Sequence, residues 1–202
     1  MQSVEFKIEL AIKSKPRGFL LFPEDFSDKG SAESIRKALQ SLKEKKVIRQ
    51  VAHGIYVRPK ISELIGELMP TAEEVAIGIS KRDRIRTVPT GAYALNALGL
   101  STQVPMKIVL LTDGSSRIVK VGKRSIKFKK TTPKNLLAKG QISRLVIQAL
   151  KEIGNGKVTK EEEKKIIEQL MQENQKALKH DIDLAPVWIQ KIMKKALQNV
   201  ES

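Results

Sequence analysis

The stretch SAESIRKALQSLKEKKVIRQVAHGIYVRP, residues 31–59, decides the fold of the N-terminal part of the chain. Four of its apolar residues fall at positions i, i+3, i+4 and i+7, the spacing of one buried helical stripe: Ile35, Ala38, Leu39 and Leu42. Ser31 precedes them, and its hydroxyl can accept a hydrogen bond from the amide of Glu33 or Ser34. The pattern therefore predicts an amphipathic helix that begins just after Ser31.

The opposite face of this helix is small or polar at its leading end and cationic behind it. It carries Ala32, Ser34, Arg36, Lys37, Gln40 and Ser41. A helix that enters the major groove of DNA needs little bulk at its leading end, donors for base edges and positive charge toward the phosphates. Solvated faces of ordinary amphipathic helices look the same, so the helix alone does not decide between the two interpretations.

A β-hairpin is predicted directly after the helix. Ile55, Tyr56 and Val57 have high strand propensity, and Ala52-His53-Gly54 has the composition of a hairpin tip. Gly54 can adopt the positive φ that a tight turn requires. Arg49 and Arg58 flank the hairpin and could pair with phosphates, whereas His53 is either a bystander at the tip or a donor to a phosphate or base.

The residues before Ser31 complete a recognisable order of elements. A helix over residues 4–14 ends before Pro16, an extended segment follows at residues 19–22, and Pro23 starts a short helix anchored by Phe26. Helix, short helix, helix and hairpin is the order of a winged helix-turn-helix. Eight residues are predicted to contact DNA: Ser31, Ser34, Arg36, Lys37, Gln40, Arg49, His53 and Arg58.

The charge of the chain agrees with a polyanionic partner. The 202 residues include 38 Lys and Arg against 22 Asp and Glu, a net charge of +16, which favours nucleic acid over a merely solvated basic surface. Residues 1–60 carry a net +6, residues 61–140 a net +8 and residues 141–202 a net +2. The basic surface therefore belongs to the first two thirds.

Several classes of site and location are disfavoured by composition. The chain has no cysteine, which excludes disulfides, thiolate catalysis and cysteine-based zinc sites. His53 and His180 lie far apart without a ligand spacing, so we expect no metal and no cofactor. No apolar run approaches the roughly 18 residues of a membrane span, and nothing resembles a signal peptide. The expected location is the cytoplasm of a microbe, away from membranes.

The middle part, residues 61–140, is predicted to be a mixed α/β domain. A short helical pattern runs from Lys60 to Pro70, and a helix over residues 71–86 begins with a Thr71–Glu74 capping box and ends in the cationic run KRDRIR. The buried strand KIVLLT ends at the turn Asp113-Gly114. A basic hairpin over residues 117–130 follows, and the sequence leaves open whether it touches DNA or a protein partner.

Residues 141–202 are predicted to be helices that pack on the middle domain. Helical periods cover residues 141–150 and 159–179, and a last helix runs from Asp183 or Leu184 to Val200. Core packing is the favoured role of its apolar stripe, with an exposed partner-binding face as the alternative. The fold class is thus α+β: an N-terminal winged helix-turn-helix, a mixed α/β domain and a C-terminal helical segment.

Four segments in one order resemble a known family: HGIYVRP (53–59), PTGAYALNALGLSTQVP (89–105), VLLTDG (109–114) and KFKKTTPKNL (127–136). The chain resembles the AbiEi-type antitoxins of type IV toxin–antitoxin and abortive-infection systems over about residues 10–138. The resemblance implies a winged helix that represses the protein's own operon and a C-terminal domain that neutralises a nucleotidyltransferase-like toxin. In that family an arginine often precedes the wing glycine, where this chain has His53.

We therefore predict a transcriptional autorepressor that binds its own operator as double-stranded DNA and acts as an antitoxin. No Walker, G-x-G-x-x-G, G-x-S-x-G or H-E-x-x-H motif is present, so we expect no enzyme activity and no catalytic residue. The alternative is a nuclease-like enzyme targeted by the winged helix, with Asp113 as its best candidate. A third hypothesis is a protein-interaction module whose basic surface binds an acidic toxin.

Overall fold

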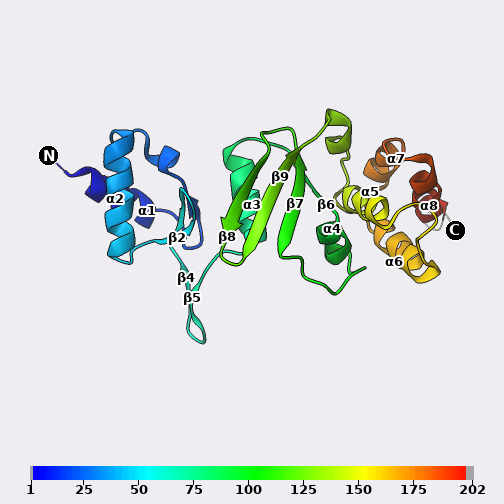
Figure 1. Ribbon diagram of the computed structural model, residues 1–202, viewed down its shortest axis with the longest axis horizontal. Helices are drawn as coiled ribbons and strands as arrows, with labels where there is room; N and C mark the ends of the chain where they lie inside the picture. The colour runs from blue at the N-terminus through cyan, green and yellow to red at the C-terminus, as the bar shows by residue number, and fades with distance from the viewer. Residues whose placement is uncertain (1, 199–202) are drawn as a thin grey trace. The chain divides into compact units, whose positions relative to one another are not determined.

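The computed structural model describes residues 2–198 and has an α+β fold that divides into two compact units. Among the described residues, the first unit comprises residues 2–79 together with 119–124, and the second comprises residues 80–118 together with 125–198. Figure 1 follows the elements along the chain. The sequence-based boundaries at residues 60 and 140 stay predictions.

The first unit begins with helices and a small antiparallel sheet. Its elements are α1 (Val4–Lys13), β1 (Leu20–Leu21), the 3-10 helix η1 (Pro23–Phe26), α2 (Ala32–Glu44), β2 (Arg49–Ala52), β3 (Ile55–Val57), β4 (Lys60–Ser62), β5 (Gly66–Leu68) and α3 (Ala72–Arg82), whose last residues belong to the second unit. β3 lies between β1 and β2. The helix 4–14, the extended segment, the short helix at Pro23 and the hairpin are thus confirmed.

The core of the first unit forms where the helical stripes meet this sheet. All four stripe residues of α2 are buried, and Phe26 is almost fully buried, as predicted. Gly78 of α3 permits a close approach, because an added Cβ would lie 2.3 Å from Leu20 Cδ1. The helix therefore accepts a glycine in its interior, at a cost of roughly 1 kcal/mol relative to alanine.

The predicted helical pattern between Lys60 and Pro70 is wrong. These residues form the hairpin β4–β5, with Ile61 opposite Glu67 and Ser62 opposite Gly66. Gly66 has a φ of +75°, which suits the turn and not a helix. So short a helix gains too few hydrogen bonds to repay its nucleation.

The second unit holds a four-stranded mixed sheet and a group of helices. Its elements are β6 (Thr87–Thr90), α4 (Ala92–Ala97), β7 (Lys107–Thr112), β8 (Arg117–Val121), β9 (Arg124–Lys130), η2 (Pro133–Leu136), α5 (Gln141–Ile153), α6 (Lys160–Leu170), α7 (Gln175–Ile182) and α8 (Val187–Gln198), with the tip of the β8–β9 hairpin assigned to the first unit. The strand order is β6-β7-β9-β8, with β7 and β9 parallel. The buried strand and the basic hairpin are confirmed.

Two predicted helices of the C-terminal part have different bounds. The helix over residues 159–179 is two helices, because the Glu173 carboxylate accepts the amides of Ile142 and Ser143 and Asn174 caps α7. The last helix begins at Val187, since Leu184 still bonds the end of α7, and Val200 lies outside the described residues. Its apolar stripe is buried among α4 to α7, which confirms core packing. No helix within residues 2–198 is long and apolar enough to cross a membrane.

Candidate nucleic-acid interface

α2 begins in the way that its sequence predicts. The Ser31 hydroxyl accepts a hydrogen bond from the Ser34 amide at 3.2 Å, and the Ser34 hydroxyl donates to the Ser31 carbonyl oxygen at 2.9 Å. These bonds satisfy polar groups that a helix start leaves without intrahelical partners. Ser31 and Ser34 therefore form a small, polar leading end, and Ser31 is exposed.

The outer face of α2 presents Arg36, Lys37 and Gln40 to solvent. Lys37 pairs with Glu33 at 2.8 Å, and the Gln40 amide donates to Glu44 at 2.8 Å. Within the described residues, no side chain pairs with Arg36. Exposed pairs of this kind contribute only about 0.2–1 kcal/mol, so Lys37 and Gln40 can exchange these partners for an external one.

The hairpin β2–β3 lies next to the end of α2. Lys43 Nζ lies 3.3 Å from Gln50 Oε1, which joins the last turn of the helix to β2. Gly54 has a φ of +66° at the tip, and His53 beside it is exposed. A bulge between Gln50 and Ala52 adds local twist to the ribbon. The helix face and the ribbon thus belong to one structural unit.

Arg49 and Arg58 are held by the protein itself. Arg49 donates to the carbonyl oxygens of Lys46 and Ile48 and pairs with Glu67 of β5 at 2.7 Å. Arg58 donates to the Lys13 carbonyl oxygen at 3.2 Å, at the end of α1. Both side chains are only partly exposed. Their first role is to tie the hairpin to its neighbours, and a phosphate would have to share their remaining donors.

α1 is fixed to α2 by an ion pair between Glu5 and Lys45. The hydrogen bond from Lys45 holds the pKa of Glu5 below its usual range, and the same bond raises the pKa of Lys45. Sequence reasoning missed this pair, because its members lie 40 positions apart.

A comparison with family models places these features in a wider group. Residues 7–178 match the model described as a family of unknown function, DUF6088. The chain belongs to this family. No curated protein and no solved structure matches it. The match spans both units and includes the whole candidate interface.

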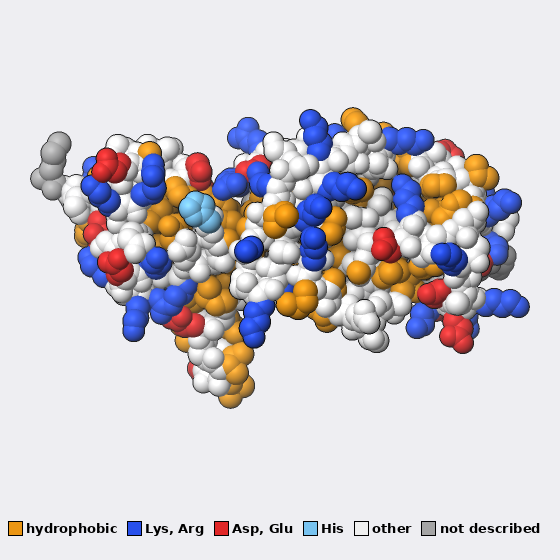
Figure 2. All heavy atoms as spheres, in the orientation of Figure 1, with side chains coloured by type: hydrophobic (Ala, Val, Ile, Leu, Met, Phe, Trp, Pro, Cys, Tyr) orange, Lys and Arg blue, Asp and Glu red, His pale blue; other side chains and the backbone are white. Residues whose placement is uncertain are grey.

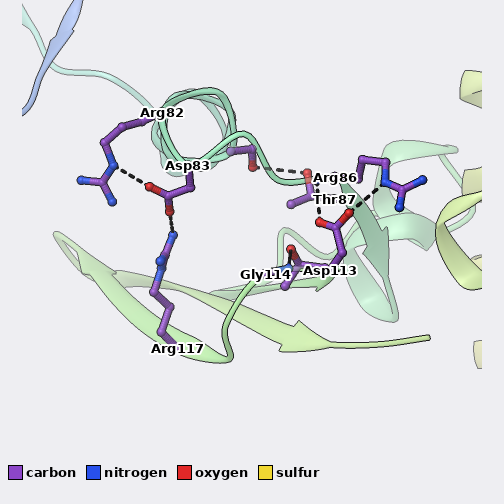
Figure 3. Close-up of polar contacts among 9 residues, drawn as sticks. Arg82, Asp83, Arg86, Thr87, Asp113, Gly114 and Arg117 are labelled. Carbon is purple, nitrogen blue, oxygen red and sulfur yellow. Dashed lines mark hydrogen bonds and ion pairs between the residues drawn. The ribbon is translucent and has the colours of Figure 1, made fainter. Parts of the chain in front are cut away.

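Two arginines of the cationic run KRDRIR, residues 81–86, contact acidic side chains, namely Asp83 within the run and Asp113 (Figure 3). Asp83 accepts hydrogen bonds from Arg82 and Arg117, and Asp113 accepts two from Arg86. Partial burial works to raise the pKa of Asp83, but the two arginines outweigh it and the pKa lies below its usual range. The helix α3 ends at Arg82, before the predicted residue 86, and Arg84 has a φ of +53°.

Asp113, the candidate of the nuclease-like alternative, lies in a turn in which Gly114 donates to the Thr112 hydroxyl. Both oxygens of its carboxylate face Arg86. Among the described residues, no three His, Asp or Glu side chains gather in a way that could hold a metal ion. The hydrogen bonds between Arg86 and Asp113 join the ends of two strands. Within residues 2–198, no further carboxylates gather around Asp113 to hold a metal ion.

The β4–β5 hairpin adds a surface that sequence reasoning missed. Leu64 is 94% exposed and Ile65 73% exposed, and Ile61, Leu68 and Met69 are exposed as well. Figure 2 shows hydrophobic side chains along this hairpin. Contiguous exposed apolar side chains commonly mark protein-interaction sites. The sequence pattern of these residues predicted a short helix instead of this hairpin.

Proposed function

We propose that this protein is a DNA-binding transcriptional regulator whose first sixty residues act as a winged helix-turn-helix. The observation that carries the proposal is the exposed face of α2, with Arg36, Lys37 and Gln40 beside the β2–β3 hairpin. The net charge of +16 supports a polyanionic partner. In this proposal α2 reads base edges and the hairpin lies along the backbone.

The side chains of α2 match the chemistry of base recognition. Arginine donates two hydrogen bonds to guanine, and glutamine exchanges two with adenine, each worth about 1–3 kcal/mol of discrimination. Gln40 follows Arg36 by four positions, so the two side chains lie on one face of the helix. Ser31 and Ser34 add little bulk ahead of them, which lets the helix start approach the duplex closely.

We further propose that the regulator acts as an antitoxin against a nucleotidyltransferase-like toxin and represses its own operon. This part rests on the resemblance to AbiEi-type antitoxins. The β4–β5 hairpin supports a protein partner, because Leu64 and Ile65 would be covered in a complex. A gene for such a toxin should overlap or follow the gene of this protein.

The DNA-binding part is tested with Arg36→Ala and Gln40→Ala in the full chain. Bound fragments are first selected from the host genome, and gel shifts then compare the selected site with random DNA. We expect each variant to weaken binding to the selected site by about 5- to 100-fold and binding to random DNA much less. Lys164→Ala, at an exposed position of α6, is the charge-matched control for Arg36. Equal losses on both DNAs would contradict base recognition by α2.

The antitoxin part is tested by co-expression with the neighbouring nucleotidyltransferase-like protein. We expect the wild-type chain to restore growth and Leu64→Glu with Ile65→Glu to fail, while operator binding persists. Val187→Glu is the control, since Val187 is 70% exposed on α8. Rescue by the hairpin variant would remove the hairpin from the partner surface, and absence of rescue by the wild type would reject the antitoxin role.

A further inference from the structure

A small hollow in the second unit lies between η2 and α5. Its polar lining consists of Lys134, Asn135, Arg144, Gln148 and Lys151, and three apolar residues complete the lining: Ala138, Ile147 and Leu184. The hollow has a volume of about 10 Å³, room for one water-sized atom. It lies wholly within the second unit, far in sequence from α2.

Three cations face this hollow, and none of the residues that line it is acidic. Arg144, Gln148 and Lys151 occupy positions i, i+4 and i+7 of α5, so they share one helix face. Lys134 adds a cation from η2. Burial lowers the pKa of Lys151 and the nearby Lys134 charge lowers it further. The protein thus holds like charges together without a counter-ion from the lining residues.

Gln148 is the second, independent observation. Its side chain lines the hollow, and the residue is only 5% exposed. Its amide nitrogen and oxygen are not among the fully buried side-chain atoms that lack a partner, so the hollow is where this amide can meet solvent or a ligand. A bound acceptor in the hollow would satisfy its NH₂ group.

A contact with Asn135 joins Lys151 to η2. Its Nζ donates to Asn135 Oδ1 at 3.4 Å, while the Asn135 NH₂ group donates to the Thr131 hydroxyl at 2.8 Å. The chain of bonds runs from the end of β9 through η2 to α5. The ammonium group thus has a long contact with Asn135, which also lines the hollow.

We propose that Lys134, Arg144, Gln148 and Lys151 bind a phosphate group, one of whose oxygens enters the hollow beside Gln148. A phosphate carries several acceptor oxygens that can meet donors converging from two elements, whereas a carboxylate is satisfied by one bidentate arginine. The source is either a free phosphate or a phosphate of a nucleic acid backbone, since both present the same oxygens. The site does not depend on DNA recognition by α2.

The test uses the full chain and inorganic phosphate, titrated at constant ionic strength with chloride as the reference anion. We expect a saturable rise in the melting temperature and a shift of the Gln148 side-chain NH₂ resonances. Lys151→Gln and, as a second variant, Lys134→Gln should each weaken phosphate binding by about tenfold. Lys157→Gln is the control, because Lys157 is exposed and does not line the hollow.

A second experiment, with a random-sequence DNA duplex, distinguishes a free phosphate ligand from a backbone phosphate. If the pocket takes a backbone phosphate, Lys151→Gln weakens duplex binding and lowers its salt dependence, while Arg36→Ala leaves the phosphate titration unchanged. If it takes free phosphate, Lys151→Gln alters only the phosphate titration. Equal phosphate responses of wild type and Lys151→Gln, or no response beyond chloride, would overturn the site and leave the role of α2 untouched.

Discussion

The backbone amide and the guanidinium group of Arg86 both donate to the Asp113 carboxylate, at 2.9 Å and 2.8 Å. Arg86 precedes β6 and Asp113 follows β7, and these strands pair antiparallel. The two residues therefore close one end of this strand pair. The hydrogen bond from the guanidinium group is the main reason why the pKa of Asp113 lies below its usual range.

This contact predicts the acid response of Asp113→Asn. A carboxyl whose pKa is lowered on folding contributes stability above its unfolded pKa of about 3.9, and that contribution is lost as the pH falls through the lower folded value. We expect the variant to unfold at less urea than wild type at pH 7, and the difference to shrink below about pH 3.9. Asp183→Asn, on an exposed residue, is the control. A difference of the same size at both pH values would argue against the ion pair.

The same position tests the nuclease-like alternative. We expect no magnesium-dependent cleavage of DNA by the wild-type chain, because both Asp113 oxygens face Arg86. Incubation of labelled duplex with and without magnesium checks this expectation. Cleavage that Asp113→Ala abolishes would favour an enzyme.

Asp181 is fully buried, and we expect its removal to destabilise the second unit strongly. Its carboxylate accepts the amides of Lys139 and Gly140 at 2.9 Å and 2.7 Å and contacts His180 Nδ1. Asp181→Ala leaves these donors without an acceptor, which costs about 2–4 kcal/mol in the free energy of unfolding. Asp183→Ala, two positions away and exposed, should cost less than about 0.5 kcal/mol. Similar values for the two variants in urea unfolding would show that the bonds contribute little.

Two substitutions at Ser31 distinguish an effect on helix stability from an effect on DNA binding. Aspartate caps a helix as well as serine does, so Ser31→Asp should keep the stability of the first unit, whereas Ser31→Ala should lose about 1 kcal/mol. The new negative charge would face the phosphates at the leading end of α2. We therefore expect Ser31→Asp to bind DNA more weakly than Ser31→Ala, as measured by gel shift beside thermal unfolding. Stronger binding by the aspartate variant would contradict the proposed approach of α2.

Salt dependence tests the electrostatic part of the proposal. Each phosphate that the protein neutralises contributes about −0.9 to the slope of log affinity against log salt. We expect a steep slope for the wild-type chain and, if Arg36 meets a phosphate instead of a base, a slope lower by about 1 in Arg36→Ala. Fluorescence anisotropy between low and moderate salt provides both values. A flat response would remove the electrostatic argument.

Features that depend only on neighbouring residues could be predicted from local sequence patterns. The Ser31 cap, the Thr71–Glu74 capping box and the Gly54 turn all depend on neighbours in the chain, and the structure contains each of them. The break in the predicted helix at Glu173 depends on α5, some thirty positions earlier. The distant contact leaves no local pattern, whereas the Asn174 cap of α7 is a local signal that sequence reasoning missed.

The candidate surfaces divide in the same way. The spacing of Arg36, Lys37 and Gln40 already indicated an outer face, because the helical period assigns each position to one side. The sequence predicted that Arg49 and Arg58 contact phosphates, but the fold gives each of them a partner within the protein. Arg49 pairs with Glu67, and Arg58 donates to the Lys13 carbonyl oxygen. For the proposed phosphate pocket, the spacing along α5 places Arg144, Gln148 and Lys151 on one helix face. That Lys134 of η2 lies beside them follows only from the fold.

Sequence alone determined the helical and extended periods, the caps, the turns and the excess of positive charge, since all of these follow from residue type and near neighbours. Tertiary structure decided that the segment between Lys60 and Pro70 is an exposed hairpin, which arginines remain available, and where cations meet without carboxylates. The physical reason is that a side chain's partner is set by distance in space. Folding brings together Arg86 and Asp113, or Lys134 and Lys151, regardless of their separation along the chain.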